Sequence, residues 1–188
     1  MLLSETFTAL QSFGLILAVS SSVFLWRFHA VKRKIMHSLK VMPTIAVVGP
    51  KLTDRSQLIK YLSFTQPVKI FKGLYQSVDK QMFLIDVDLE DLDIKKLLNI
   101  NLKRMLYVFD LSRLPLEQQI EEFKRLTKNL KVECIPVVVS ASEKEGLKSL
   151  EEKLGKVYKA YALDLEKELE DIKLLQEMLK GVEKVVAP

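Results

Sequence analysis

A short polar turn with phosphate-binding character begins at Gly49, directly after the β-branched run TIAVVG. Its sequence, GPKLTDRS, aligns with the pattern G-x-x-x-x-G-K-[ST], in which backbone N–H groups surround phosphates, a lysine supplies charge and a hydroxyl binds Mg²⁺. Gly49 and Ser56 fit this pattern, but Asp54 replaces the second glycine and Arg55 the lysine. Since Asp54 would repel phosphate and Arg55 aims its charge differently from lysine, we expect weakened phosphate binding. The alternative is an ordinary β–α turn in which Asp54 or Thr53 caps the helix.

Acidic and hydroxyl side chains also lie at or just after the ends of other apolar runs. FLIDVDL contains Asp86, LYVFDLS contains Asp110, and PVVV is followed by Ser140 and, three residues later, Glu143. Ligands of α/β folds bind outside the carboxyl ends of the strands, so these groups are expected near the first turn. Because Mg²⁺ prefers oxygen ligands, the metal candidates are Asp86 and the hydroxyl of Ser56. Asp110 is interpreted as a cap at the end of its strand.

The elements that would position these side chains alternate along the chain. Continuous apolar runs predict strands, and helical spacing of apolar residues predicts helices. Strands are expected over residues 44–49, 68–78, 81–87, 104–111 and 133–139, and helices over 55–63, 91–102, 116–128, 143–161 and 163–184. This order predicts an α/β fold with a mostly parallel sheet and helices on both of its faces.

Composition excludes several functional classes. The single cysteine, Cys134, excludes a disulfide framework or a multi-cysteine zinc site, and its place in a strand predicts a buried core residue. Of the net charge of +5, residues 1–40 contribute +4, because they hold five basic side chains and one acidic one. The basic character is therefore local, and direct binding of nucleic acid is not expected.

An uncharged run of 21 residues, from Thr6 to Trp26, predicts one N-terminal transmembrane helix. At about 1.5 Å per residue it would span roughly 31 Å, close to the thickness of the hydrocarbon core of a bilayer. A basic cluster from Arg27 to Lys40 follows, which predicts a cytosolic C-terminal part by the positive-inside rule. We therefore expect an anchor with its basic flank in residues 1–40 and a globular domain in residues 41–188. A targeting peptide and a buried or interfacial helix are the alternatives.

The strand ends resemble those of small GTPases. FLIDVDL is similar to the strand that ends in D-x-x-G, with Leu89 in place of the glycine. SASE stands where the guanine motif N-K-x-D would be, and the same segment also resembles the later S-A-K loop, which would mean that a strand is lost. The resemblance implies a P-loop GTPase-like fold, with GTP and Mg²⁺ as candidate cofactors, no efficient hydrolysis and no assigned catalytic residue. The implied cofactor-binding residues are Gly49, Lys51, Asp54, Arg55, Ser56, Asp86, Ser140 and Glu143.

A GTPase-like domain directly behind one N-terminal membrane helix resembles the family of signal recognition particle receptor beta subunits, over about residues 5–170. The resemblance implies a single-pass protein of the endoplasmic reticulum membrane that tethers the receptor alpha subunit for co-translational protein targeting. Its implied partners are the lipid bilayer and the alpha subunit, with the translocon as a further candidate. An unrelated anchored pseudo-GTPase scaffold and a weakly active small GTPase are the alternative functions.

The implied partner surface lies after the second and third strands of the fold, over residues 71–77 and 88–94. Phe71, Leu74 and Tyr75 are large side chains suited to anchoring an interface, and the alternative is that they pack on the sheet. The acidic segment beginning at Asp88 would favour a basic partner.

Overall fold

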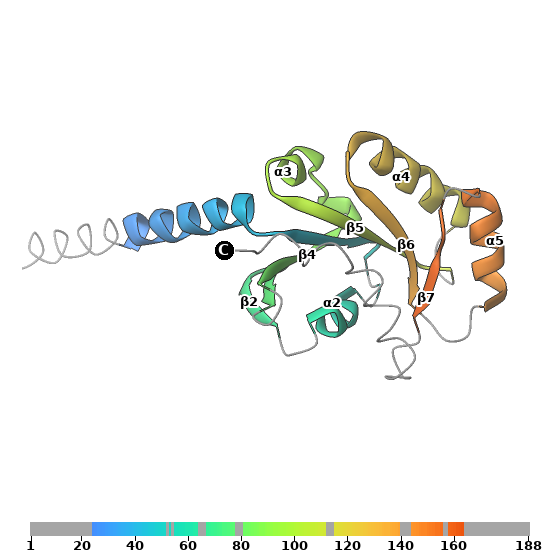
Figure 1. Ribbon diagram of the computed structural model, residues 1–188, viewed down its shortest axis with the longest axis horizontal. Coiled ribbons are helices and arrows are strands. Elements are labelled where there is room, and N and C mark those ends of the chain that lie inside the picture. Colours follow the sequence, from blue (N-terminus) through green and yellow to red (C-terminus); the bar gives the residue numbers. More distant parts are fainter. Residues whose placement is uncertain are drawn as a thin grey trace, which may run out of the picture. The chain divides into compact units, whose positions relative to one another are not determined.

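The computed structural model describes residues 24–51, 53, 55–63, 67–77, 81–111, 115–139, 144–155 and 158–163 (Figure 1). By contacts the chain divides into two units, Met1–Ser38 and Leu39–Pro188. In the first unit, the described residues are helical, and this helix continues to residue 41. The elements that follow are β1 (Thr44–Gly49), α2 (Arg55–Ser63), β2 (Val68–Phe71), β3 (Leu74–Ser77), β4 (Met82–Asp88), the 3₁₀ turn η1 (Leu89–Asp91), α3 (Ile94–Leu98), β5 (Leu102–Phe109), α4 (Leu116–Asn129), β6 (Glu133–Val139), α5 (Lys144–Leu154) and β7 (Tyr161–Leu163).

The described strands of the second unit form one seven-stranded sheet in the order β2-β3-β4-β1-β5-β6-β7. Strands β4, β1, β5, β6 and β7 pair in parallel, and β2 and β3 join the β4 edge in antiparallel orientation. Val47 lies opposite Asp86, and Gly49 lies opposite Asp88. The carboxyl ends of β1 and β4 therefore meet at the same edge of the sheet.

Alternating side chains of the strands supply two hydrophobic clusters, one on each face of the sheet. In β1, Ile45 and Val47 belong to the cluster that includes Leu58 of α2, whereas Ala46 and Val48 belong to the cluster that includes Phe123 of α4. Helix α2 covers one face, and α3, α4 and α5 lie on the other (Figure 1). The predicted class, a mostly parallel sheet with helices on both faces, is confirmed.

The segment over residues 68–78 was predicted as one strand, and this is wrong. It forms the hairpin of β2 and β3, which turns at Gly73. Gly73 has φ +74°, and a Cβ atom there would lie 2.6 Å from the carbonyl oxygen of Asp86. Its own carbonyl accepts a hydrogen bond from the backbone N–H of Asp86 over 2.7 Å. Conformation and close approach thus require glycine at the turn.

The predicted helix over residues 91–102 is also wrong in extent, because only η1 and the five-residue α3 form before β5 begins at Leu102. Likewise, the predicted helix over 143–161 ends at Leu154, and β7 follows as a strand parallel to β6. The further helix predicted over 163–184 lies outside the described residues beyond Leu163.

The predicted transmembrane run, residues 6–26, lies outside the described residues except for its last three positions. Within the part of the chain that the structure describes, no helix combines the length and the apolar character needed to cross a membrane.

Candidate functional site

Arg55 follows the turn between β1 and α2 and is the centre of the hydrogen-bond network there. It is the first residue of α2, and only 8% of its surface is exposed, although arginine is rarely buried without partners. Its side chain carries five N–H donors in a rigid fork and accepts no hydrogen bond. The groups around it must therefore be acceptors, and the structure supplies them from the turn itself and from β4.

Two carboxylates of β4 face the guanidinium. Nε of Arg55 donates to Oδ1 of Asp86 over 2.7 Å, and Nη2 lies 3.7 Å from Oδ2 of Asp88. The exposed fractions of the side chains are 10% for Arg55, 21% for Asp86 and 18% for Asp88. The pair of Arg55 and Asp86 is thus largely withdrawn from solvent, where loss of one charged partner is costly because the other remains desolvated.

The turn supplies the remaining acceptors. Nη1 of Arg55 donates to the carbonyl of Gly49 over 2.7 Å, to the carbonyl of Pro50, and to Oγ1 of Thr53 over 3.0 Å. The Thr53 hydroxyl in turn donates to the carbonyl of Pro50 over 2.8 Å. A phosphate requires donors at this place. The oxygens gathered here instead suit a cation, and the guanidinium is that cation.

Gly49 is required by the neighbouring strand. A Cβ atom at this position would lie 2.8 Å from the carbonyl oxygen of Val108 and 3.2 Å from the Cβ of that residue in β5. Any larger residue would have to push β1 and β5 apart. The glycine that fits the phosphate-loop pattern thus has a packing role in the sheet, independent of any ligand.

Of the other predicted cofactor and metal residues, the structure describes Lys51 and Ser56, and no contact of either with Arg55 is found. Lys51 is exposed and lies 3.8 Å from the carboxylate of Glu90, an exposed pair of small energetic value. Ser56 is exposed on α2. Among the described residues, no three His, Cys, Asp or Glu side chains are grouped so as to hold a metal ion. Asp54, Ser140 and Glu143 lie outside the described residues.

The structure thus brings together Gly49, Arg55 and Asp86 of the predicted set and adds Thr53 and Asp88. Asp88 was assigned to the partner surface instead. A signal for its role exists in the sequence, because Asp86 and Asp88 are two residues apart and therefore project from the same face of a strand. Thr53 was considered only as one of two helix caps, with Asp54, in the alternative interpretation of the turn, and nothing in the sequence indicates its contact with the arginine.

The position of the SASE segment follows from strand order. It comes after β6, which lies beside β5, and a further strand, β7, follows α5. Residues 140–143 themselves lie outside the described residues, and the described strands do not show the loss of a strand that the S-A-K alignment would require. The preceding strand end, at Asp110, is held by Gln119 of α4. The backbone N–H of Asp110 donates to Oε1 over 2.8 Å, and Nε2 donates to the Asp110 carbonyl over 2.6 Å.

The order of strands and helices also agrees with solved structures. A variant of Era from Aquifex aeolicus, bound to GDP·AlF₄⁻, superimposes with a TM-score of 0.50 and 15% identity, over 77% of this chain and 57% of that chain. The fold is P-loop GTPase-like. Identity this low supports the fold alone.

Two further neighbours have lower TM-scores. Era in complex with MgGDPNP and 16S ribosomal RNA gives 0.49 at 14% identity, over 79% of this chain and 58% of that one. A bacterial dynamin pair described as sensing and tethering membranes gives 0.47 at 12% identity, over 84% and 37%. The chain thus spans less than two thirds of each of these three proteins. Neither a protein-family model nor a curated protein sequence matches it.

Proposed function

We propose that the chain is a membrane-anchored, GTPase-like adaptor that acts by binding another protein and does not hydrolyse GTP efficiently. The observation that carries this proposal is the position of Arg55. The residue that replaces the phosphate-loop lysine is held by Asp86 and by the carbonyls of Gly49 and Pro50. Phosphate binding would have to compete with these contacts.

The proposed partner is the alpha subunit of the signal recognition particle receptor, at the cytosolic face of the endoplasmic reticulum. Three features support it: the uncharged run over residues 6–26, the basic flank behind it, and the GTPase-like fold of the following domain. GTP and Mg²⁺ are proposed as weak ligands here; one solved Era structure holds GDP·AlF₄⁻ and the other MgGDPNP. The translocon is a second proposed partner, and direct contact with nucleic acid is not proposed.

The geometry narrows the proposed partner surface. Leu74 is 8% exposed, and Tyr75 packs against the core, so both serve the sheet. Phe71 and Val68 of the edge strand β2 are 40% and 53% exposed. Exposed apolar side chains on an edge strand suit a protein contact. We therefore propose Phe71 and Val68 as the side chains that contact the partner protein.

Co-purification of the alpha subunit from detergent-solubilised membranes tests the partner. Wild type is expected to recover it, Phe71→Ala with Val68→Ala is expected to recover several-fold less, and the matched control Lys124→Ala on α4 is expected to equal wild type. No recovery by wild type would reject the alpha subunit as partner. Equal recovery by all folded variants would reject β2 as the interface.

Carbonate extraction of membranes tests the anchor separately. We expect the protein to stay in the pellet, and protease added to intact microsomes should digest the globular domain. Release by carbonate, or protection of the domain, would reject the anchor. The runner-up function, a weakly active small GTPase, is favoured if the purified protein turns over GTP in the presence of Mg²⁺.

A further inference from the structure

The described helix of the first unit carries an apolar stripe. Phe24, Phe28, Val31 and Ile35 are separated by four, three and four residues, which places them on one face of a helix. The exposed fractions of the first three are 71%, 47% and 50%. Isolated exposed apolar side chains are common, but a continuous stripe with two aromatic rings indicates a surface that is covered in the functional state.

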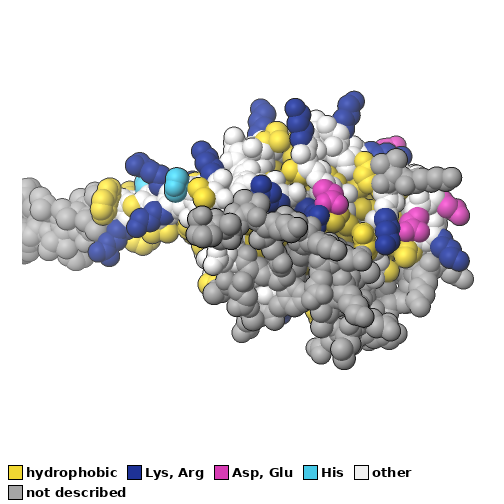
Figure 2. Space-filling model, in the orientation of Figure 1, with side chains coloured by type: hydrophobic (Ala, Val, Ile, Leu, Met, Phe, Trp, Pro, Cys, Tyr) yellow, Lys and Arg dark blue, Asp and Glu magenta, His cyan; other side chains and the backbone are white. Residues whose placement is uncertain are grey.

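Basic side chains border this stripe on both sides. Arg27 lies three residues after Phe24, and Lys34 lies three residues after Val31, on one border, whereas Lys32 lies four residues after Phe28, on the other. Arg33 is on the opposite face. The helix over residues 24–38 therefore has four basic side chains and no acidic one. Figure 2 shows its mixture of dark blue, cyan and yellow side chains.

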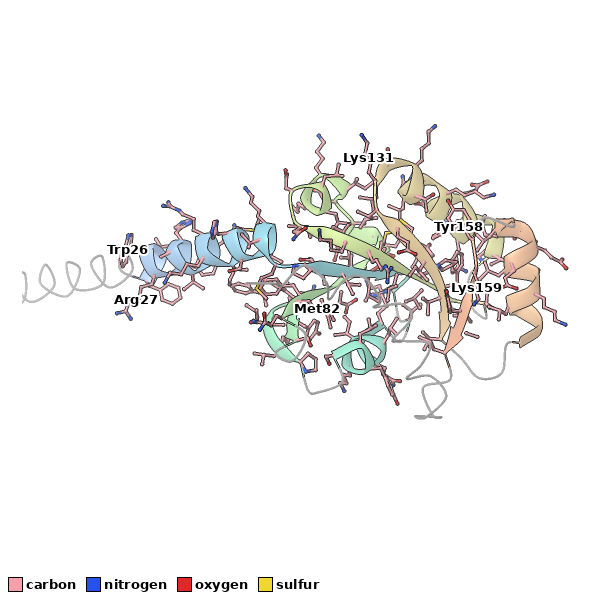
Figure 3. The ribbon with its side chains drawn as sticks, viewed as in Figure 1. Trp26, Arg27, Met82, Lys131, Tyr158 and Lys159 are labelled. Carbon is pink, nitrogen blue, oxygen red and sulfur yellow. The ribbon has the colours of Figure 1, made fainter. Side chains whose placement is uncertain are left out.

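We propose that the helix over residues 24–38 lies flat in the headgroup layer of an anionic membrane, with its apolar stripe toward the acyl chains. Long basic side chains at the borders of such a stripe reach outward to the headgroups while their methylene groups cover apolar surface. Anionic lipid attracts each of them, and no acidic side chain opposes this attraction. Trp26 and Arg27 project in different directions from the first described turn (Figure 3), and Trp26, two residues after Phe24, lies away from the stripe.

The flat orientation differs from that of a helix that continues a span of residues 6–26 along the membrane normal. If the helix simply continued a span along the membrane normal, Ile35 would lie nine residues beyond Trp26, roughly 13 Å farther into water. In the flat orientation, Ile35 lies at the same depth as Val31, and the opposite face of the helix stays in water. The two arrangements therefore predict different patterns of solvent contact along the helix.

The pattern is measured on the full chain in vesicles, with single cysteines carrying an environment-sensitive fluorophore. A Cys134→Ala background removes the chain's own cysteine. Val31→Cys and Ile35→Cys report on the stripe, and the matched controls Arg33→Cys and His37→Cys report on the other face. Vesicles contain phosphatidylcholine alone or a mixture with phosphatidylserine, and nitroxide-labelled lipid serves as the quencher.

In the anionic vesicles we expect the lipid quencher to act several-fold more strongly at the two stripe sites than at the two control sites. Replacing Lys32 and Lys34 with glutamine should reduce the preference for anionic vesicles by about an order of magnitude. The matched change of Lys124 and Lys128 on α4 should leave that preference unchanged.

Three results would overturn the proposal. Equal water contact at all four sites would show a helix that stands away from the surface. Equal quenching in neutral and anionic vesicles would remove the role of the basic borders. Stripe sites shielded from water but untouched by the lipid quencher would show a covering protein. Carbonate extraction reports on residues 6–26 alone, so failure of the anchor is distinguishable from each of these.

Discussion

Nε of Arg55 donates to Oδ1 of Asp86 over 2.7 Å, at the edge of the sheet where β1 and β4 end. The sequence resemblance places Arg55 at the lysine position of the phosphate loop and makes Asp86, in the strand similar to the one that ends in D-x-x-G, a metal candidate. Here the two groups neutralise each other. The contact therefore joins α2 to β4, and it uses two residues that the sequence resemblance assigns to cofactor binding.

Removing the carboxylate should destabilise the domain. Asp86→Asn leaves the buried guanidinium with only the more distant carboxylate of Asp88, and we expect a loss of about 3 kcal/mol in the free energy of unfolding. The double change Arg55→Met with Asp86→Leu should recover part of this loss, because both members of the close pair are removed and only the carboxylate of Asp88 remains. Urea denaturation followed by circular dichroism measures both.

The exposed pair of Lys51 and Glu90 provides the control for that experiment. Lys51→Met should change the free energy of unfolding by no more than about 0.5 kcal/mol. If Asp86→Asn lowered the free energy of unfolding no more than Lys51→Met does, the contact of Arg55 with Asp86 would not stabilise the domain. The interpretation that the Arg55 guanidinium is the cation held by the acceptors of the turn would then be wrong.

Restoring the phosphate-loop residues should raise nucleotide affinity. Asp54→Gly removes a repelling carboxylate, and Arg55→Lys supplies a narrower cation that cannot hold the same fork of acceptors. We expect the double variant to bind a fluorescent GTP analogue with Mg²⁺ at least tenfold more tightly than wild type. The control Arg55→Met frees the same acceptors without a cation and should bind no better than wild type.

The natural protein should hydrolyse GTP slowly or not at all, since Leu89 replaces the glycine of D-x-x-G and Glu90 and Asp91 follow it. Single-turnover measurement with purified protein gives the rate. Turnover on the scale of assisted GTPases would show that these replacements have been misinterpreted.

Cys134 should resist thiol reagents in the folded protein. Burial, and secondarily the charge of Glu133, raise the pKa of its thiol from 9.0 to about 12. The thiol thus stays protonated in the folded state between about pH 9 and 12, where it ionises in the unfolded chain. Its contribution to stability is complete below pH 9 and is lost as the pH rises toward 12.

Labelling with a chromogenic disulfide at pH 8 measures this reactivity. We expect labelling to be at least a hundredfold slower in native buffer than in concentrated urea. Rapid labelling of the native protein at pH 8 would contradict the burial of this side chain.

Gln119 should stabilise the domain through the end of β5. Its buried amide makes two hydrogen bonds with the backbone of Asp110. Gln119→Leu removes both and leaves backbone groups to find other partners, at a cost of about 1–3 kcal/mol. Gln118 is the neighbouring exposed residue of α4, and Gln118→Leu should be nearly neutral. Chemical denaturation of the two variants compares them directly.

Sequence periodicity predicted the parts of the fold that local patterns determine. The strands over residues 44–49 and 133–139 and the helix over 55–63 have their predicted bounds, because apolar runs and helical spacing are properties of contiguous residues. The hairpin of β2 and β3 was missed because its turn depends on Gly73, whose conformation is imposed by contact with Asp86. Strand β7 was missed because three residues are too few to show alternation.

The candidate site was predictable in its residue types and not in its contacts. The strand ends locate Gly49, Arg55 and Asp86 at one edge, as expected for an α/β fold. The direction of the Arg55 side chain depends on acceptors from the turn and from β4, and no periodicity encodes such a contact. A wide, permanently charged arginine at the lysine position was noted as a weakness for phosphate, and the structure shows the partners that it has instead.

Arg55 is covalently part of the chain, so its effective concentration at the turn is set by the backbone and not by the surrounding solution. The occupancy of the site by a diffusible ligand would depend on the ligand's concentration, and its dissociation rate would limit how long the site stayed occupied. The turn that Gly49 and Pro50 form around the guanidinium keeps its ion without such exchange. While Arg55 stays in place, the acceptors at this edge of the sheet therefore have a partner that does not depend on the concentration of any ligand.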